Sequence, residues 1–208
     1  EKTILSVGSE ASNLATVDAS AAADDFTVDI SAFAASSTVT GGAGNDIIDG
    51  GAAADVISTG TGIDTLVRAG DGTDGADTIA DFTAGAGGDV IDLQANASVG
   101  AGGGAAGVTI EAAAATTIAA QTGLIVVATD VATVDAAWLA AAITTDVGVL
   151  TTRFTTAGDI AYVVFDDGAA SYLGIMTEVG GNAGWATGDG DTLTLLMTLT
   201  GVTDRSEE

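Results

Sequence analysis

The sequence predicts a mainly β protein in which a short glycine- and aspartate-rich coil precedes a β-rich carboxy-terminal region with one helix. Three observations support this fold class. A nine-residue pattern of glycine, aspartate and an aliphatic residue recurs through residues 41–67. Many other segments alternate polar and apolar residues with the period of two that is typical of strands. Apolar residues make up 47% of the chain but aromatic residues only 4%, which favours thin stacked layers over one thick core.

The charge of the chain limits its partners. Its 208 residues include 4 basic and 29 acidic residues, for a net charge of −25. Such a surface repels phosphate backbones and anionic lipid, so we expect neither nucleic acid nor a membrane surface as a partner. The most apolar stretch, residues 105–128, is made mostly of small residues, so no membrane span is predicted. Cysteine and histidine are absent, which leaves oxygen ligands suited to hard cations.

The texture of the sequence divides the chain into four regions. Period-two alternation in residues 26–30 and 37–40 indicates short strands before the repeat. We interpret the chain as degenerate β-strand repeats (1–40), the repeat block with its edge (41–93), an Ala/Gly/Ser linker (94–107) and a β-rich carboxy-terminal region (108–208).

The repeat keeps three residue types in phase. Its units are GGAGNDIID (41–49), GGAAADVIS (50–58) and TGTGIDTLV (59–67). Glycine occupies the second position of each unit, an aliphatic residue the eighth, and aspartate the sixth, as Asp46, Asp55 and Asp64. A flexible glycine linker, the simplest alternative, has no reason to preserve this phase.

The three units resemble RTX repeats, the calcium-binding nonapeptide G-G-x-G-x-D-x-U-x of type I secreted bacterial proteins. The resemblance implies a short parallel β-roll in which each unit gives one turn and one strand, so that two units complete a coil. Asp46 and Asp64 are then expected on one side of the roll and Asp55 on the other. Coils stack at about 4.8 Å, where two carboxylates repel by roughly 3 kcal/mol at an effective dielectric constant near 20. A bound Ca²⁺ reverses the sign of that interaction.

Calcium prefers about six to eight oxygen ligands, so main-chain carbonyls are expected to complete the set. The resemblance implies these metal-site residues in the block: Gly42, Gly44, Asp46, Asp55, Gly60, Gly62 and Asp64. Ala53 and Thr59 depart from the glycine pattern, so we expect one or two ions rather than a long array. Because the ligands come together only in the folded coil, folding is expected to require calcium.

The stretch after the repeat adds further candidate ligands. AGDGTDGADTIADF (69–82) and GGDVIDL (87–93) resemble the edge of the roll in serralysin-type carboxy-terminal domains. On that resemblance Asp71, Asp77 and Asp81 are metal-site candidates, with a solvated loop carboxylate as the alternative for each.

The carboxy-terminal region predicts strands and one helix. Leu124–Ala128 forms an apolar run, and Asp130 is a plausible N-cap for a helix over residues 131–144. Residues 160–165 and 172–177 predict a hairpin, and residues 192–199 a final strand. The ending resembles the carboxy-terminal strands of type I secreted surface-layer proteins, in which an uncleaved secretion signal lies near the end.

We expect no enzyme, since the conspicuous carboxylate pairs, Asp166/Asp167 and Asp189/Asp191, fall in glycine-containing turns. Two functions remain. The first is a calcium-dependent surface-layer or matrix protein that self-assembles outside the cell, with itself and cell-surface polysaccharide as partners. The second is the carboxy-terminal folding and export module of a secreted hydrolase or adhesin. Both imply a secreted, extracellular or cell-surface location.

Overall fold

The computed structural model describes residues 3–6, 14–69, 73–84, 87–94, 108–109, 124–126, 160–177, 179 and 191–202. Every regular element in these residues is a strand. The fourteen strands are β1 (Thr3–Ser6), β2 (Thr16–Asp18), β3 (Phe26–Asp29), β4 (Thr38–Thr40), β5 (Ile47–Asp49), β6 (Val56–Ser58), β7 (Thr65–Ala69), β8 (Asp77–Ile79), β9 (Val90–Gln94), β10 (Val108–Thr109), β11 (Leu124–Val126), β12 (Ile160–Asp166), β13 (Ala170–Thr177) and β14 (Thr192–Thr200).

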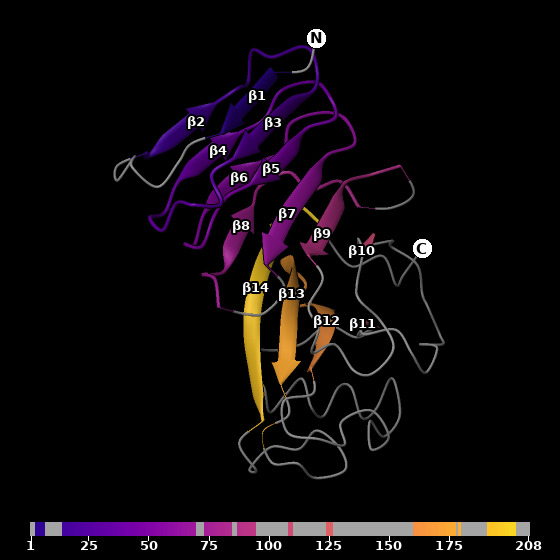
Figure 1. The fold of residues 1–208 in the computed structure, drawn as a ribbon. Helices are drawn as coiled ribbons and strands as arrows, with labels where there is room; N and C mark the ends of the chain where they lie inside the picture. The colour runs from indigo at the N-terminus through magenta and orange to yellow at the C-terminus, as the bar shows by residue number, and fades with distance from the viewer. Residues whose placement is uncertain are drawn as a thin grey trace.

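The first nine strands wind into a parallel β-solenoid with two facing sheets (Figure 1). Odd-numbered strands form one sheet, in the order β1-β3-β5-β7-β9, and even-numbered strands β2-β4-β6-β8 lie in the other. The chain therefore crosses from one sheet to the other at every turn, and two successive strands complete one coil.

A single apolar side chain per strand fills most of the space between the sheets. In the three-residue strands β4, β5 and β6, only the middle side chain is fully buried. These residues stack from coil to coil because the strands pair in register: Val28, Ile48, Leu66 and Ile91 in one sheet, and Val17, Val39, Ile57 and Ile79 in the other. Residues next to them face outward, and Val56 is 47% exposed.

The long carboxy-terminal strands extend the second sheet of the roll. β14 pairs in parallel with β8, β13 pairs antiparallel with β14, and β12 pairs antiparallel with β13 (Figure 1). Ile79 of the roll and Leu199 of β14 lie opposite each other and belong to the same apolar core. At the other edges β11 joins β12 in parallel and β10 joins β9 antiparallel.

Several sequence predictions can be placed on this fold. The strands found within residues 3–40 continue both sheets of the roll, and β9 reaches Gln94, the first residue of the predicted linker. The predicted hairpin is present as β12 and β13. The predicted helix over residues 131–144 and the rest of the linker lie outside the described residues. Among the described residues, no helix is long and apolar enough to cross a membrane.

Candidate metal centre

The turns between strands form two edges of the roll, which we name the first and second edges. The first edge contains the turns 41–46 and 59–64 and the described residues between β8 and β9, 80–84 and 87–89, which lead from the second sheet into the first. The second edge contains the turn 50–55 and the residues that precede β8. In every coil from β5 onward, an aspartate stands where a turn passes into its next strand, and its side chain is almost completely buried: Asp46, Asp55, Asp64, Asp77 and Asp89.

Three of these aspartates form a stack along the first edge. Each carboxylate accepts a hydrogen bond from the main chain of the preceding coil. The N–H of Phe26 donates to Asp46 Oδ1 at 2.8 Å, that of Asp46 to Asp64 Oδ1 at 2.7 Å, and that of Asp64 to Asp89 Oδ1 at 3.0 Å. The stack therefore ties one coil to the next through charged acceptors, which make stronger hydrogen bonds than neutral ones.

The second edge repeats this arrangement with two aspartates. The N–H of Ser37 donates to Asp55 Oδ1 at 2.7 Å, and the N–H of Asp55 donates to Asp77 Oδ1 at 2.9 Å. The buried guanidinium of Arg68 lies beside the second carboxylate: Nη1 donates to Asp77 Oδ2, and Nη2 donates to the carbonyl of Gly75. Among the described residues, Arg68 is the single basic side chain.

Glycines allow the turns of the first edge to approach closely. Gly60 and Gly62 have positive φ angles of 100° and 142°, which disfavour any residue with a β-carbon. A β-carbon at Gly60 would also overlap the carbonyl oxygen of Gly42, and one at Gly62 would overlap that of Gly44. The carbonyl groups of one turn thus point directly at the glycines of the next turn.

Two carboxylate oxygens in the stacks are buried without a hydrogen-bond partner: Asp64 Oδ2 on the first edge and Asp55 Oδ2 on the second. Burial raises the pKa of Asp64 to about 6, with further increases from the charges of Asp89, Asp46 and Asp81. Burial also raises the pKa of Asp55. A buried anionic oxygen without a partner is costly, so both positions suit a hard cation.

Asp81 and Asp89 complete the first edge from the coil that follows. Asp81 accepts hydrogen bonds from the N–H of Thr59 at 2.7 Å, from Ser58 Oγ at 2.5 Å and from the N–H of Gly60 at 3.1 Å. Asp89 accepts one from the N–H of Thr83 at 2.8 Å and a longer one from Thr59 Oγ1. The sequence prediction missed Asp89, although GDVI around it repeats the aspartate–x–aliphatic order of NDII at residues 45–48.

Most of the predicted metal-site residues lie together. Gly42, Gly44, Asp46, Gly60, Gly62 and Asp64 share the first edge, where Asp81 joins them, whereas Asp55 and Asp77 lie on the second edge. Asp71 lies outside the described residues. In the described part of the chain, no three acidic side chains converge on one point. A cation on the first edge would therefore need main-chain carbonyls as well as carboxylates.

The family model for the RTX calcium-binding nonapeptide repeat (4 copies) matches residues 33–66. The matched segment begins before the three units of residues 41–67 and includes β4, β5 and β6. No curated protein and no solved structure matches the chain. Residues 33–66 thus match the RTX calcium-binding repeat, and they lie in a parallel β-solenoid.

Proposed function

We propose that this chain is a calcium-dependent extracellular structural protein that folds and self-assembles at the bacterial cell surface, as a surface-layer or matrix component. The observation that carries the calcium dependence is the partnerless, buried Asp64 Oδ2 within a stack of aspartates. RTX repeats at residues 33–66 support both the identity of the ion and a secreted location. The net charge of −25 makes a divalent cation the natural counterpart of the folded chain.

The residues of the first edge would hold the ion. Asp46 and Asp64 would contribute carboxylate oxygens, and the turns that contain Gly42 and Gly44 would contribute carbonyls. Asp81 reaches the same turns from the following coil. When bound, calcium supplies positive charge among buried carboxylates, which otherwise repel one another in the folded roll.

This linkage suits a protein that is exported before it folds. In a compartment poor in calcium, repulsion among the stacked aspartates opposes closure of the roll. Outside the cell, ion binding adds its free energy to that of folding, so the roll closes there. The resemblance of the carboxy-terminal strands to those of type I secreted surface-layer proteins is what points to assembly at the surface, with the chain itself and cell-surface polysaccharide as partners.

The alternative is a folding and export module at the carboxy terminus of a secreted hydrolase or adhesin. The resemblance of residues 69–93 to a serralysin-type roll edge favours it. Asp77 and Asp81, which that resemblance singled out, both contact the preceding coil. The two proposals share the calcium-dependent roll and differ in whether the purified chain assembles.

Circular dichroism during a calcium titration tests the shared part. We expect strand signal to appear with calcium and to vanish with chelator. Asp46→Ala combined with Asp64→Ala should abolish this response. Asp18→Ala combined with Asp29→Ala removes the same charge at exposed aspartates whose hydrogen bonds stay within their own turns, and should leave the response unchanged. Intact calcium-induced folding in the first double variant would rule out the first-edge site.

Negative-stain electron microscopy of the same samples separates the two functions. Sheets or filaments that form on adding calcium would support the structural protein. A monodisperse monomer in saturating calcium would contradict it and favour the export module.

A further inference from the structure

At Gly41 and Gly50, position one of the nonapeptide faces the carboxylate of its own unit, whereas at Thr59 the hydroxyl contacts Asp81 and Asp89 of the following coil. Residues 41, 50, 59 and 68 occupy this position in successive units. A β-carbon added at Gly41 would lie 2.9 Å from Asp46 Oδ2, and one added at Gly50 would lie 3.0 Å from Asp55 Oδ2. A side chain at either glycine would therefore approach the second oxygen of the stacked aspartate.

Arg68 is the counterpart of Gly50 one coil later, because β5 and β7 pair in register with Asp49 opposite Val67. Its side chain is buried, with 3% of its surface exposed, and Nη1 donates to Asp77 Oδ2. Asp77 is the counterpart of Asp55 one coil later, because β6 and β8 pair in register and the Asp55 N–H donates to Asp77 Oδ1. Arg68 thus bonds Oδ2 of Asp77, the oxygen equivalent to the one that faces Gly50 in Asp55.

The two carboxylates of the second edge consequently differ in how their oxygens are engaged. Both oxygens of Asp77 are bonded within the protein, Oδ1 to the Asp55 N–H and Oδ2 to Arg68. Asp55 has the same bond at Oδ1, from Ser37, but its Oδ2 is buried with no partner.

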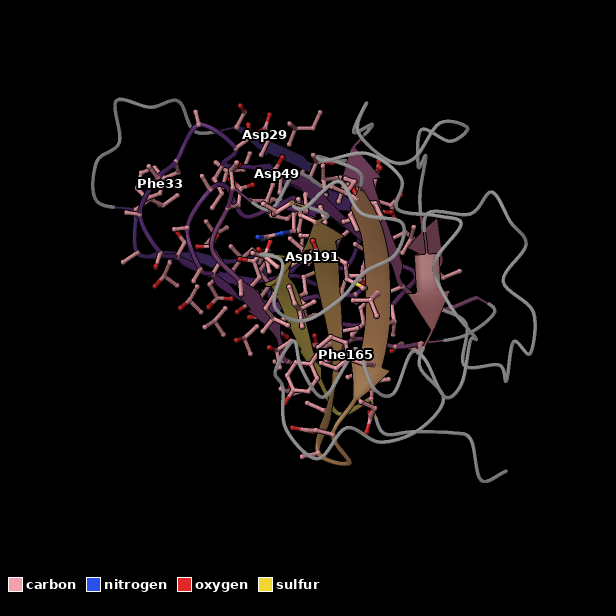
Figure 2. All side chains as sticks on the ribbon, turned by 90° about the horizontal axis from the view of Figure 1, so that it is seen from below. Asp29, Phe33, Asp49, Phe165 and Asp191 are labelled. Atoms are coloured by element: carbon pink, nitrogen blue, oxygen red, sulfur yellow. The ribbon has the colours of Figure 1, made fainter. Side chains whose placement is uncertain are left out.

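The charge of Arg68 acts on more than one carboxylate. It opposes the rise in pKa that burial causes in Asp77, Asp55 and Asp49. Asp49 pairs in register with Asp29 across β3 and β5, and the two lie close together in Figure 2. The positive charge of Arg68 therefore lies among several carboxylates, in the coil where arginine replaces the glycine of position one.

We infer that the Arg68 guanidinium is a built-in cation that takes the place of a calcium ion at Asp77 on the second edge of the roll. Asp77 is then a partner of arginine rather than a calcium ligand. The second edge closes at this level without an ion, while the first edge depends on calcium. This inference rests on the proposed calcium dependence of the roll.

The number of calcium ions bound per chain, measured by native mass spectrometry and equilibrium dialysis, tests the inference. Arg68→Gly restores the residue found at Gly41 and Gly50, and we expect it to bind one more ion than the wild type. Arg68→Lys keeps the charge and should bind the wild-type number. Asp77→Asn removes the carboxylate with little change of shape and should also bind the wild-type number.

Each outcome decides for or against the inference. Loss of one ion in Asp77→Asn would identify Asp77 as a calcium ligand and overturn it, even if Arg68→Gly failed to fold. A folded Arg68→Gly with the wild-type number of ions would overturn it as well, while the proposed function stood. If the wild type bound no calcium, the proposed function would fail first and the inference would fail with it.

Discussion

The roll and the long carboxy-terminal strands use aspartate in opposite ways. In the hairpin between β12 and β13, aspartates are satisfied within their own turn. Asp166 accepts from the Gly168 N–H at 2.5 Å and from Ser171 Oγ at 2.9 Å, and Asp167 accepts from the Ala169 N–H at 2.9 Å and from Tyr172 Oη at 2.7 Å. In the roll, each stacked aspartate reaches another coil, and two of the five keep one oxygen without a partner.

The two regions also differ in how much apolar surface each strand buries. β4, β5 and β6 have three residues each and bury one large side chain apiece. β12, β13 and β14 have seven, eight and nine residues, and β13 alone buries Leu173, Ile175 and Met176. Figure 2 places Phe165 in this second region, well apart from Phe33 of the roll. On the proposed function, the roll therefore relies on its turns and the cation that they would hold, whereas the long strands rely on apolar packing.

Removing calcium should separate the two regions most strongly. In excess chelator we expect the amides of β4 to β7 to lose their protection from hydrogen exchange completely, because the aspartate stacks repel without the ion. β14 should lose part of its protection along with its partner β8, and β12 and β13 should retain the most. Hydrogen–deuterium exchange read by mass spectrometry measures this order. Equal loss in all strands would show that the regions form one cooperative unit.

Blocking one turn of the first edge should have the next largest effect. Gly60→Ala places a β-carbon on the Gly42 carbonyl at a φ of 100°, so it meets both a steric overlap and a disfavoured conformation. Gly201→Ala is the matched control: its φ is 85°, but no atom lies within 4 Å of the added carbon. The control should lose about 1–2 kcal/mol of unfolding free energy.

Denaturant titration in saturating calcium compares these variants. We expect Gly60→Ala to lose clearly more stability than the control and to need more calcium to fold. Equal losses in the two variants would mean that the turns of the first edge are not tightly apposed.

The repeat predicts the centre of the roll but not its ends. Asp46 and Asp64, which are 18 residues apart, fall on one edge because two unbroken nonapeptides complete a coil. The next member of that stack, Asp89, is 25 residues further on, because extra residues lie both before β8 and between β8 and β9. On the amino-terminal side Phe26 stands at the aspartate position, so sequence alone gives no polar signal that β3 already belongs to the roll.

Long-range pairing explains what else the sequence could not predict. Alternation and the Asp166–Asp167–Gly168 turn predict the hairpin of β12 and β13. Nothing local predicts that β14 adds to β8, since that pairing depends on matching an exposed strand edge more than 100 residues away. The ion pair of Arg68 with Asp77 could not be predicted either. Extra residues before β8 break the nine-residue spacing, so the sequence does not show that Asp77 is equivalent to Asp55.

Acidification should stabilise the calcium-free roll and not the long strands. Burial raises the pKa of Asp64 from its ordinary value of 3.8 to about 6. Ionised Asp64 therefore destabilises the folded state, an effect that is absent below pH 3.8 and fully developed above about pH 6. In chelator we expect strand signal to increase as the pH falls from 7 to 4. Circular dichroism measures it, and Asp64→Asn should weaken the dependence while Asp18→Asn should not.

The smallest effect should come from the hairpin, and it should not depend on calcium. Tyr172→Phe removes the hydrogen bond from Tyr172 Oη to Asp167 but keeps the stacked contact with Phe165, whose ring centroid is 5.3 Å away. We expect a loss of about 0.5–1.5 kcal/mol, the usual contribution of one hydrogen bond. Thermal unfolding at several calcium concentrations should show the same shift in Tm at each. A shift that grew as calcium was withdrawn would mean that the hairpin shares the ion dependence of the roll, and the contrast between the two regions would fail.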